Sequence, residues 1–438
     1  MRILVTALLT LCLLPALAHA QKVERPVISL SGANFRPLPL AFQPPLYQGE
    51  GANRAAGKEL DEALVQDLSV SGLFELVDRK AFLADKDEGV VPANIKFNRW
   101  LDANAEALVK VVVSGDKVIQ ADFHLYSVVT GKEELRQTYS APAEEARRLA
   151  HRFADEIFRF YTREPGAFQT KLAFVRKVKG TKQVWTADWD GRNARALTDG
   201  RMNLIPAWRP NGAGLAFTSY RNNNPDLFEL DLGSGKLSPL FQRPGNLVTG
   251  VAFSPDGKRV AFSMSEDDGN SHLWIADASG QNARRLTDGY GINSSPSFSP
   301  DSKTIAYVSN RVGTPQIHMI PADGGSPTRL TFQGDYNQTP EWSPRGDYIV
   351  FTARDERNVF DLFLLDPATR RVVKRLTQDQ GNNEEPTWSP NGRMIAFTST
   401  RSGKSHLYVM SADGNNQRQL TFGEDQVYTP TWGPFPAP

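Results

Sequence analysis

The sequence predicts an N-terminal α/β domain followed by an all-β, six-bladed β-propeller that the C-terminal strand closes. The first observation is a motif of an aromatic residue, a small residue, a proline and a turn pair, as in Trp388-Ser389-Pro390-Asn391-Gly392. Its prolines recur 44–46 residues apart, at positions 210, 255, 300, 344, 390 and 434. A period of this length is typical of propeller blades. The second observation is that helical spacing of apolar residues occurs only before about residue 165.

Composition indicates a globular protein with a large core. The chain has 438 residues, of which 40% are hydrophobic and 23% charged, and its formal net charge is +1. This balance suits one or two large domains. It lacks the basic excess that nucleic-acid binding requires, so we expect no nucleic-acid partner.

The first 20 residues predict a secretory signal. Arg2 precedes an apolar run, and Ala18-His19-Ala20 supplies the small residues that a signal peptidase reads, so cleavage is expected between Ala20 and Gln21. The run is too short to span a bilayer comfortably, so no membrane span is expected in the mature chain. The only cysteine, Cys12, lies inside the signal. Export without disulfides favours a bacterial periplasm.

Residues 21–165 are expected to form the α/β domain with a mobile N-terminal arm. The arm begins with a polar stretch at 21–25, and residues 27–32 alternate apolar and polar side chains as a short strand would. Helices are predicted over 52–67, 97–107 and 143–161. Strands are predicted over 38–42, 73–77, 107–113, 118–128 and 134–139.

Residues 166–438 are expected to form the propeller, with four strands in each repeat. The first repeat starts at 171–175, which corresponds to the second strand of a blade, and the last copy of the motif has no strand after it. The C-terminal strand should therefore complete the first blade and leave no open sheet edge. The turn residues Asp256 and Asp301 are interpreted as structural. The motif aromatics are expected to pack between neighbouring blades: Trp208, Phe253, Phe298, Trp342, Trp388 and Trp432.

The repeat at 386–401, Pro-x-Trp-Ser-Pro-x-Gly-x-x-Ile-Ala-Phe-Thr-Ser-x-Arg, resembles the propeller repeats of the TolB family. It is also similar to the propellers of prolyl oligopeptidases and dipeptidyl peptidases. Three features select TolB: the signal peptide, the preceding α/β domain, and the first-blade segment at 185–193, which is similar to a TolB segment with the pattern Asp-Tyr-Asp-Gly-x-Asn.

The resemblance implies a periplasmic binding protein of the Tol–Pal envelope system, with roles in outer-membrane integrity and cell division. In that family the propeller binds the peptidoglycan-associated lipoprotein Pal, and the N-terminal arm contacts the inner-membrane protein TolA. In this sequence the arm residues expected to make that contact are Val23, Val27, Ile28 and Leu30.

The expected Pal-binding surface is one face of the propeller, here called the channel face. It carries the loops that enter each innermost strand and those that join the second and third strands. Arginines that follow the second strand would add donors for a partner's carboxylates, although they could instead pair with acids of their own blade or end strands. The predicted residues are Asn203, Arg221, Val248, Thr249, Asn293, Ser294, Arg311, Asn337, Gln338, Arg354, Asn382, Asn383, Glu384, Arg401 and Tyr428.

No catalytic, cofactor-binding or metal-binding residues are expected. The chain lacks a Gly-x-Ser-x-Gly elbow, a P-loop, a dinucleotide fingerprint and a His-Glu-x-x-His pattern. His272 and His406 occupy equivalent places in two repeats, without metal-ligand spacing around them. The alternative hypothesis is a periplasmic propeller enzyme that hydrolyses glycans or peptides at the channel mouth, with Glu384 and Glu385 as its carboxylate pair.

Ring closure predicts different effects of trimming the two ends. Deleting residues 429–438 should destabilise the propeller severely, because it removes the closing strand. Deleting residues 21–33 should leave the propeller folded. Thermal unfolding of both variants checks this ranking, and the reverse ranking would refute closure by the C-terminal strand.

Overall fold

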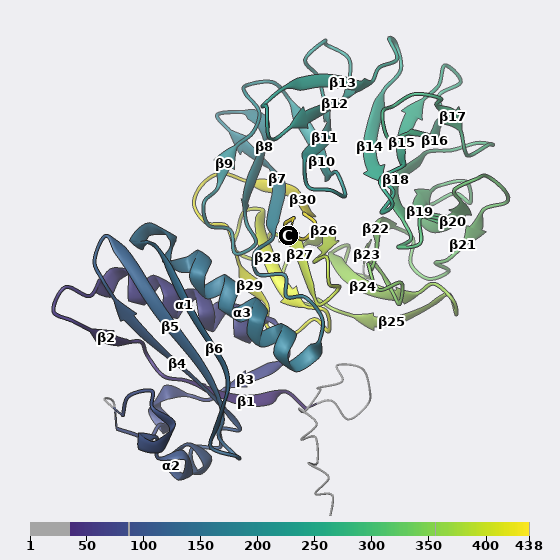
Figure 1. The fold of residues 1–438 in the computed structure, drawn as a ribbon. Coiled ribbons are helices and arrows are strands. Elements are labelled where there is room, and N and C mark those ends of the chain that lie inside the picture. Colours follow the sequence, from purple (N-terminus) through teal and green to yellow (C-terminus); the bar gives the residue numbers. More distant parts are fainter. Residues whose placement is uncertain (1–35, 86–87, 355, 438) are drawn as a thin grey trace, which may run out of the picture.

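A mixed α/β domain precedes a ring of six four-stranded sheets (Figure 1). The computed structural model describes residues 36–85, 88–354 and 356–437. The predicted fold class is confirmed. The signal cleavage site and the arm lie outside the described residues, and with them the predictions for Ala20, Gln21, Val23, Val27, Ile28 and Leu30.

One mixed sheet forms the centre of the N-terminal domain. Its strands are β1 (Leu38–Phe42), β2 (Leu46–Gln48), β3 (Phe74–Leu76), β4 (Ala107–Ser114), β5 (Val118–Ser127) and β6 (Lys132–Pro142). The order is β3-β1-β4-β5-β6, and β2 also pairs with β4. Strand β1 is parallel to both neighbours, whereas β4, β5 and β6 form an antiparallel meander. The short strand β2 is absent from the sequence prediction.

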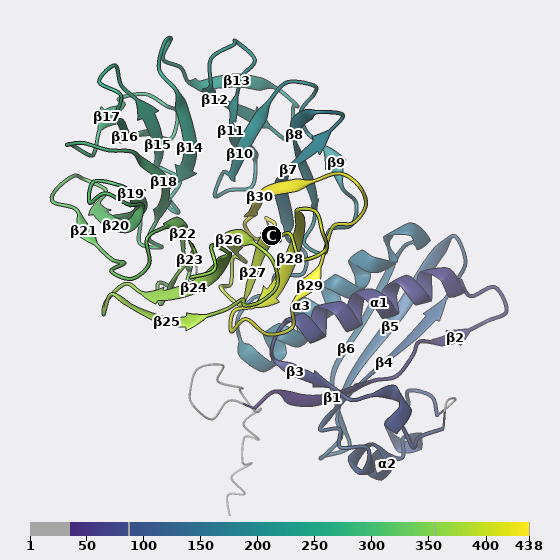
Figure 2. The same cartoon turned by 180° about the vertical axis from the view of Figure 1, so that it is seen from behind.

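Two long helices cover one face of this sheet (Figure 2). They are α1 (Arg54–Val70) and α3 (Ala146–Thr162). Helix α1 begins where the Asn53 side chain accepts a 2.9 Å hydrogen bond from the Ala56 N–H, which satisfies one free donor of the first turn. The helix predicted over 97–107 is shorter, α2 (Phe97–Asp102), because Asn104 adopts a φ of 63° just before β4 begins. Three 3₁₀ turns complete the domain: η1 (Arg79–Ala81), η2 (Pro92–Asn94) and η3 (Ala143–Glu145).

The propeller has six blades, each with four strands ordered from the channel outward. Blades 1–3 consist of β30 (Val427–Trp432), β7 (Lys171–Val178), β8 (Thr181–Asp188) and β9 (Arg195–Ala196); β10 (Asn203–Trp208), β11 (Gly214–Ser219), β12 (Asp226–Asp231) and β13 (Leu237–Phe241); and β14 (Val248–Phe253), β15 (Arg259–Ser265), β16 (Ser271–Asp277) and β17 (Arg284–Arg285). Blades 4–6 consist of β18 (Asn293–Phe298), β19 (Thr304–Ser309), β20 (Gln316–Pro321) and β21 (Thr328–Arg329); β22 (Asn337–Trp342), β23 (Ile349–Arg354), β24 (Phe360–Asp366) and β25 (Arg371–Arg375); and β26 (Asn383–Trp388), β27 (Met394–Ser399), β28 (His406–Ser411) and β29 (Arg418–Gln419).

The C-terminal strand closes the ring as predicted. Strand β30 pairs antiparallel with β7, with Val427 opposite Arg176 and Trp432 opposite Leu172. Blade 1 is therefore built from both ends of the propeller sequence, and each of the six blades has four strands.

The motif aromatics connect neighbouring blades, as expected. The Trp208 indole of blade 2 donates to the Thr431 carbonyl of blade 1, and the Trp388 indole of blade 6 donates to the Glu341 carbonyl of blade 5, both at 3.2 Å. The following turn is local, since the Asp256 carboxylate accepts hydrogen bonds from the Ser254 hydroxyl and the Lys258 N–H. Motif and turn thus have structural roles.

The N-terminal domain packs against blades 1 and 6. Its helices α1 and α3 lie between the domain's sheet and the propeller (Figure 2), and one apolar cluster runs from these helices into both blades. Within it, the fully buried Trp189 ring lies parallel to Trp432 at 6.5 Å and edge-on to His151. A continuous core of this kind fixes the two parts relative to each other.

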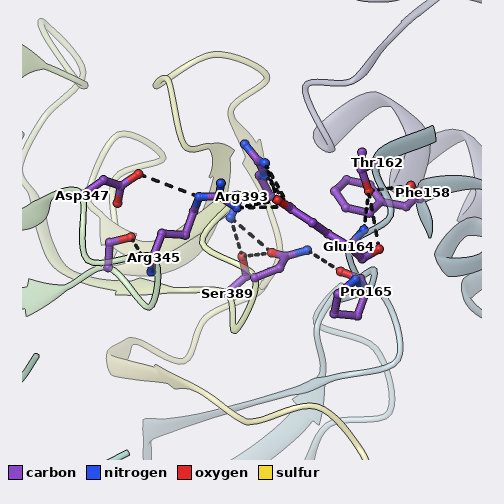
Figure 3. Close-up of polar contacts among 10 residues, drawn as sticks. Phe158, Thr162, Glu164, Pro165, Arg345, Asp347, Ser389 and Arg393 are labelled. Atoms are coloured by element: carbon purple, nitrogen blue, oxygen red, sulfur yellow. Dashed lines mark hydrogen bonds and ion pairs between the residues drawn. The ribbon is translucent and has the colours of Figure 1, made fainter. Parts of the chain in front are cut away.

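An ionic clamp holds the end of α3 on the propeller (Figure 3). The Glu164 carboxylate accepts hydrogen bonds from Arg345 of blade 5 at 2.9 Å and from Arg393 of blade 6 at 2.9 Å. Burial alone would raise the pKa of Glu164, but these two guanidinium groups hold it below its usual range. The Asn391 amide also donates to the Pro165 carbonyl at 3.1 Å. Both arginines lie in or beside the turns after innermost strands, so these turns anchor the domain.

A buried charge cluster forms a second anchor. The His151 ring of α3 contacts Asp67 of α1 at 2.8 Å and Asp190 of blade 1 at 3.4 Å, and Arg147 donates to Asp190 at 3.1 Å. Burial alone would lower the pKa of His151, but the two carboxylates raise it to about 10. The same contacts hold the pKa of Asp190 below its usual range, although burial opposes them. The imidazole is therefore a buried cation that bridges the two domains.

The raised pKa of His151 predicts a pH-dependent stability. Folded His151 keeps a proton that the unfolded chain releases near pH 6.5, so the free energy of unfolding should fall as pH rises from about 6.5 to 10. His151→Gln should remove this part of the slope. It should also cost about 3 kcal/mol at pH 7, because Asp67 loses its buried partner. Urea unfolding between pH 6 and 9 measures both effects.

His318→Gln is the matched control. Burial lowers the pKa of His318, so this group is neutral in both states above pH 7 and adds no slope there. If His151→Gln keeps the parent slope, the bridging imidazole is not the protonated group assigned here.

Candidate partner-binding face

The two faces of the propeller differ in what covers them. On the channel face the innermost strands begin, and the second strand of each blade turns into the third. On the opposite face lie the turns after the innermost strands, including those of blades 5 and 6 that hold Glu164 and Pro165. The N-terminal domain thus anchors to the opposite face. Among the described residues, no helix is long and apolar enough to cross a membrane.

Except for Asn382, which precedes β26, the residues predicted as entering loops are in fact strand residues, which corrects the sequence interpretation. Asn203, Asn293, Asn337 and Asn383 begin the innermost strands β10, β18, β22 and β26. All four are buried. They belong to strands because the first residue of each innermost strand already pairs with the last part of the second strand of the same blade. Asn203, for example, pairs with Ser219 at the end of β11.

The buried asparagines hold adjacent blades together. The Asn337 amide donates to Gln316 of blade 4 at 3.0 Å, and the Asn383 amide donates to Asp361 of blade 5 at 3.0 Å. Asn203 and Asn293 use their amides on backbone carbonyls of the preceding blade and its connecting loop. Buried amides are normally satisfied within the protein. The amide NH₂ group of each of the four donates a hydrogen bond, whereas Asn203 Oδ1 is enclosed without a partner among the described residues. These side chains therefore join neighbouring blades beneath the channel face instead of pointing to a partner.

The arginines at the ends of second strands also have partners inside the propeller. Arg311 and Arg401 donate to Asn293 and Asn383 at 3.2 and 2.8 Å. Arg354 pairs with Asp335 at 2.7 Å, and the Arg221 guanidinium lies over the ring of Phe228. Of the four arginines, only Arg354 pairs with an acid, as the alternative interpretation expects, whereas the others contact asparagines or an aromatic ring.

The other predicted residues differ in accessibility. Val248 is buried, whereas Thr249, Ser294, Gln338, Asn382, Glu384 and Tyr428 are half-buried at the start of the innermost strands. The Lys182 ammonium lies 4.8 Å from the centre of the Tyr428 ring. Apart from the arginines, these six are the predicted partner-binding residues whose side chains are still partly accessible on the channel face.

The channel contains carboxyl groups that hold protons near neutral pH. Burial and the charge of Glu385 raise the pKa of Glu384 to about 7, and burial raises the pKa of Glu341 to about 8. Glu384 accepts from Gln338 of blade 5 at 3.3 Å, whereas Glu385 accepts from the Thr429 N–H of blade 1 at 2.6 Å. The two carboxylates of the enzyme hypothesis thus bridge to different neighbouring blades.

A ring of unusual backbone conformations lines the channel. The third residue of every innermost strand has a positive φ, between 43° and 68°, and only one of the six is glycine. Each sits at a bulge in the pairing with the second strand. Such a φ is costly for residues other than glycine, so the closed ring must hold it in place. A cavity of about 460 Å³ extends from this ring to the motif aromatics. The ring consists of Ile205, Gly250, Ser295, Thr339, Glu385 and Thr429.

Exposed apolar side chains gather on the channel face. In the described part of the propeller, all exposed large apolar residues except Val372 and Val373 of the outer strand β25 lie in connections of this face or at the start of an innermost strand. Tyr290 is 86% exposed and Ile292 54% exposed. Apart from Ile205, which belongs to a predicted entering loop, these residues were not singled out from the sequence, because an apolar residue just before or after a strand looks like part of that strand. They are Met202, Ile205, Tyr220, Leu247, Tyr290, Ile292, Val312, Phe332 and Phe422.

Comparison with protein families identifies both parts of the chain. Residues 26–134 match the TolB amino-terminal domain, and residues 158–436 match the TolB beta propeller domain. The chain belongs to the TolB family. Two relatives named Tol-Pal system protein TolB align over nearly their full lengths. One, from Myxococcus xanthus DK1622, is 51% identical over 97% of each chain, and the other, from Anaeromyxobacter dehalogenans 2CP-1, is 47% identical over 99% of each chain.

A solved TolB structure shares the two-part architecture. The crystal structure of TolB from Acinetobacter baumannii superposes with a TM-score of 0.78 at 25% identity, covering 91% of this chain and 97% of that one. The TolB-family fold therefore includes the N-terminal domain as well as the propeller. Membership confirms the resemblance inferred from the repeat, the signal and the first-blade segment.

Proposed function

We propose that this chain is a periplasmic protein-binding component of the Tol–Pal envelope system. In this proposal the channel face binds the lipoprotein Pal and the N-terminal arm binds TolA, in support of outer-membrane integrity and cell division. The full-length relatives named as Tol-Pal system proteins support the system assignment. The arm assignment rests on the family resemblance.

The distribution of exposed apolar residues carries the Pal proposal. Large exposed apolar patches on a soluble protein mark interaction sites. Here they concentrate around blades 2–4 of the channel face, where Met202, Leu247 and Ile292 each precede an innermost strand. The half-buried arginines and amides beside them would supply the polar rim of a protein interface. The N-terminal domain anchors to the opposite face and leaves this surface accessible.

The enzyme hypothesis gains no comparable support. A glycosidase needs two carboxylates that flank one bond. In this chain Glu384 and Glu385 are each engaged with a different neighbouring blade, which gives both a role in joining innermost strands. Protein binding is therefore the single function proposed.

Replacing one exposed apolar residue tests the Pal site. Ile292→Asp should weaken binding of the Pal lipoprotein of the same organism at least about tenfold, or about 1.4 kcal/mol, because it places a charge in the apolar part of the interface. Val373→Asp is the matched control, since Val373 is 50% exposed, close to the 54% of Ile292, but lies on an outer strand away from the channel face. Isothermal titration calorimetry with purified Pal measures both affinities.

The possible outcomes separate the two halves of the proposal. No measurable Pal binding to the parent at micromolar concentrations, or equal binding by parent and Ile292→Asp, would reject the channel face as the Pal site. In the same assay, deletion of residues 21–33 should abolish TolA binding and spare Pal binding. Retained TolA binding would reject the arm.

A further inference from the structure

The hairpin between β15 and β16 in blade 3 brings three potential metal ligands together. One ligand atom from each of Glu266, Asp268 and His272 lies within 4.8 Å of the other two. Glu266 is half-buried and Asp268 is exposed at the hairpin, whereas His272 lies at the start of β16 and is only 1% exposed. The sequence expectation of no metal site at His272 did not include this hairpin geometry.

His272 differs from the residues at the same place in other blades. At this buried position Gln316 accepts from the Thr331 hydroxyl, Asp361 accepts from Thr377, and His406 lies 3.4 Å from Thr421 Oγ1. Within the described residues the His272 ring makes no hydrogen bond, and its Nδ1 is enclosed without a partner. Since buried polar groups are normally satisfied, a ring without a bond beside two carboxylates indicates an external ligand.

The charges around the hairpin favour a cation. The Asp268 carboxylate accepts a 2.9 Å hydrogen bond from the Asn270 N–H. The Arg285 guanidinium already lies 3.1 Å from Glu266 and also pairs with Asp288 at 2.7 Å. Arg285 can keep Asp288 as its partner if it leaves Glu266. Arg285 therefore occupies the Glu266 carboxylate as a positive charge, and a metal ion would displace it from there.

We propose that Glu266, Asp268 and His272 form a binding site for a divalent transition metal. One imidazole and two carboxylates are donors that Zn²⁺ accepts, whereas Ca²⁺ and Mg²⁺ prefer ligand sets made of oxygen alone. Three protein ligands leave at least one coordination position free. The hairpin lies on the channel face, where the loop containing Tyr290 runs beside it through the Ser271–Ile292 bridge. The site does not depend on the proposed Pal or TolA binding.

Zinc titration of the tag-free mature chain tests the site. Competition with a chromophoric chelator should show one Zn²⁺ bound per chain. Asp268→Asn and His272→Gln should each weaken Zn²⁺ binding at least about tenfold, since even residues that only support a ligand have effects of that size. Asp268 is exposed, so its variant should fold as the parent does. Zn²⁺ should raise the Tm of the parent and leave that of Asp268→Asn unchanged.

Two further variants make the result specific. His406→Gln changes the equivalent histidine of blade 6, which lies near Lys404 and Glu424 but, among the described residues, has no metal-ligand group of three around it. This variant should bind Zn²⁺ as the parent does. Arg285→Gln should bind Zn²⁺ more tightly, because the competing cation is gone. Equal affinity of the parent, Asp268→Asn and His272→Gln, or no Zn²⁺ binding by the parent at micromolar concentrations, would overturn the proposal.

Discussion

Closure of the ring by β30 is the constraint on which the rest of the structure depends. The pairing of Trp432 with Leu172 joins the two ends of the propeller sequence in one blade. Only a closed ring gives every innermost strand two neighbours, and so supports both the positive φ values along the channel and the polar links between blades. The same closing blade supplies Trp432, against which Trp189 packs at the domain junction. Closure therefore fixes the channel face and the position of the N-terminal domain together.

The closed ring divides its two faces between two roles. The opposite face carries the turns that follow the innermost strands. There Arg345 and Arg393 donate hydrogen bonds to the Glu164 carboxylate (Figure 3). The channel face keeps its asparagines and arginines in bonds within the propeller, yet exposes apolar side chains such as Tyr290. Such a surface suits a protein partner. Its polar groups are already bonded within the propeller, so few of them would have to lose water when a partner covers the exposed apolar side chains.

The sequence predicted the fold well, because a blade is a local unit whose aromatic and turn recur with its period. It predicted the site only partly. The repeat pattern does not distinguish an exposed asparagine from a buried one. Asn337, for example, is buried against Gln316 of the preceding blade, and the period of the repeat does not reveal this contact. Leu247 and Ile292 were missed because their exposure depends on how far the neighbouring connections reach. The charge cluster around His151 depends on docking between domains, which no local pattern encodes.

In the proposed function, the channel face is the surface that binds a protein partner. Amide hydrogen exchange of the full mature chain, measured with and without saturating Pal, tests it most directly. Exchange should slow in the connections that precede the innermost strands of blades 2–4, around Met202, Leu247 and Tyr290. It should not change in the turns of the opposite face around Asn211 and Asp256. Slowed exchange in those turns, with the channel face unchanged, would refute the channel face as the binding surface.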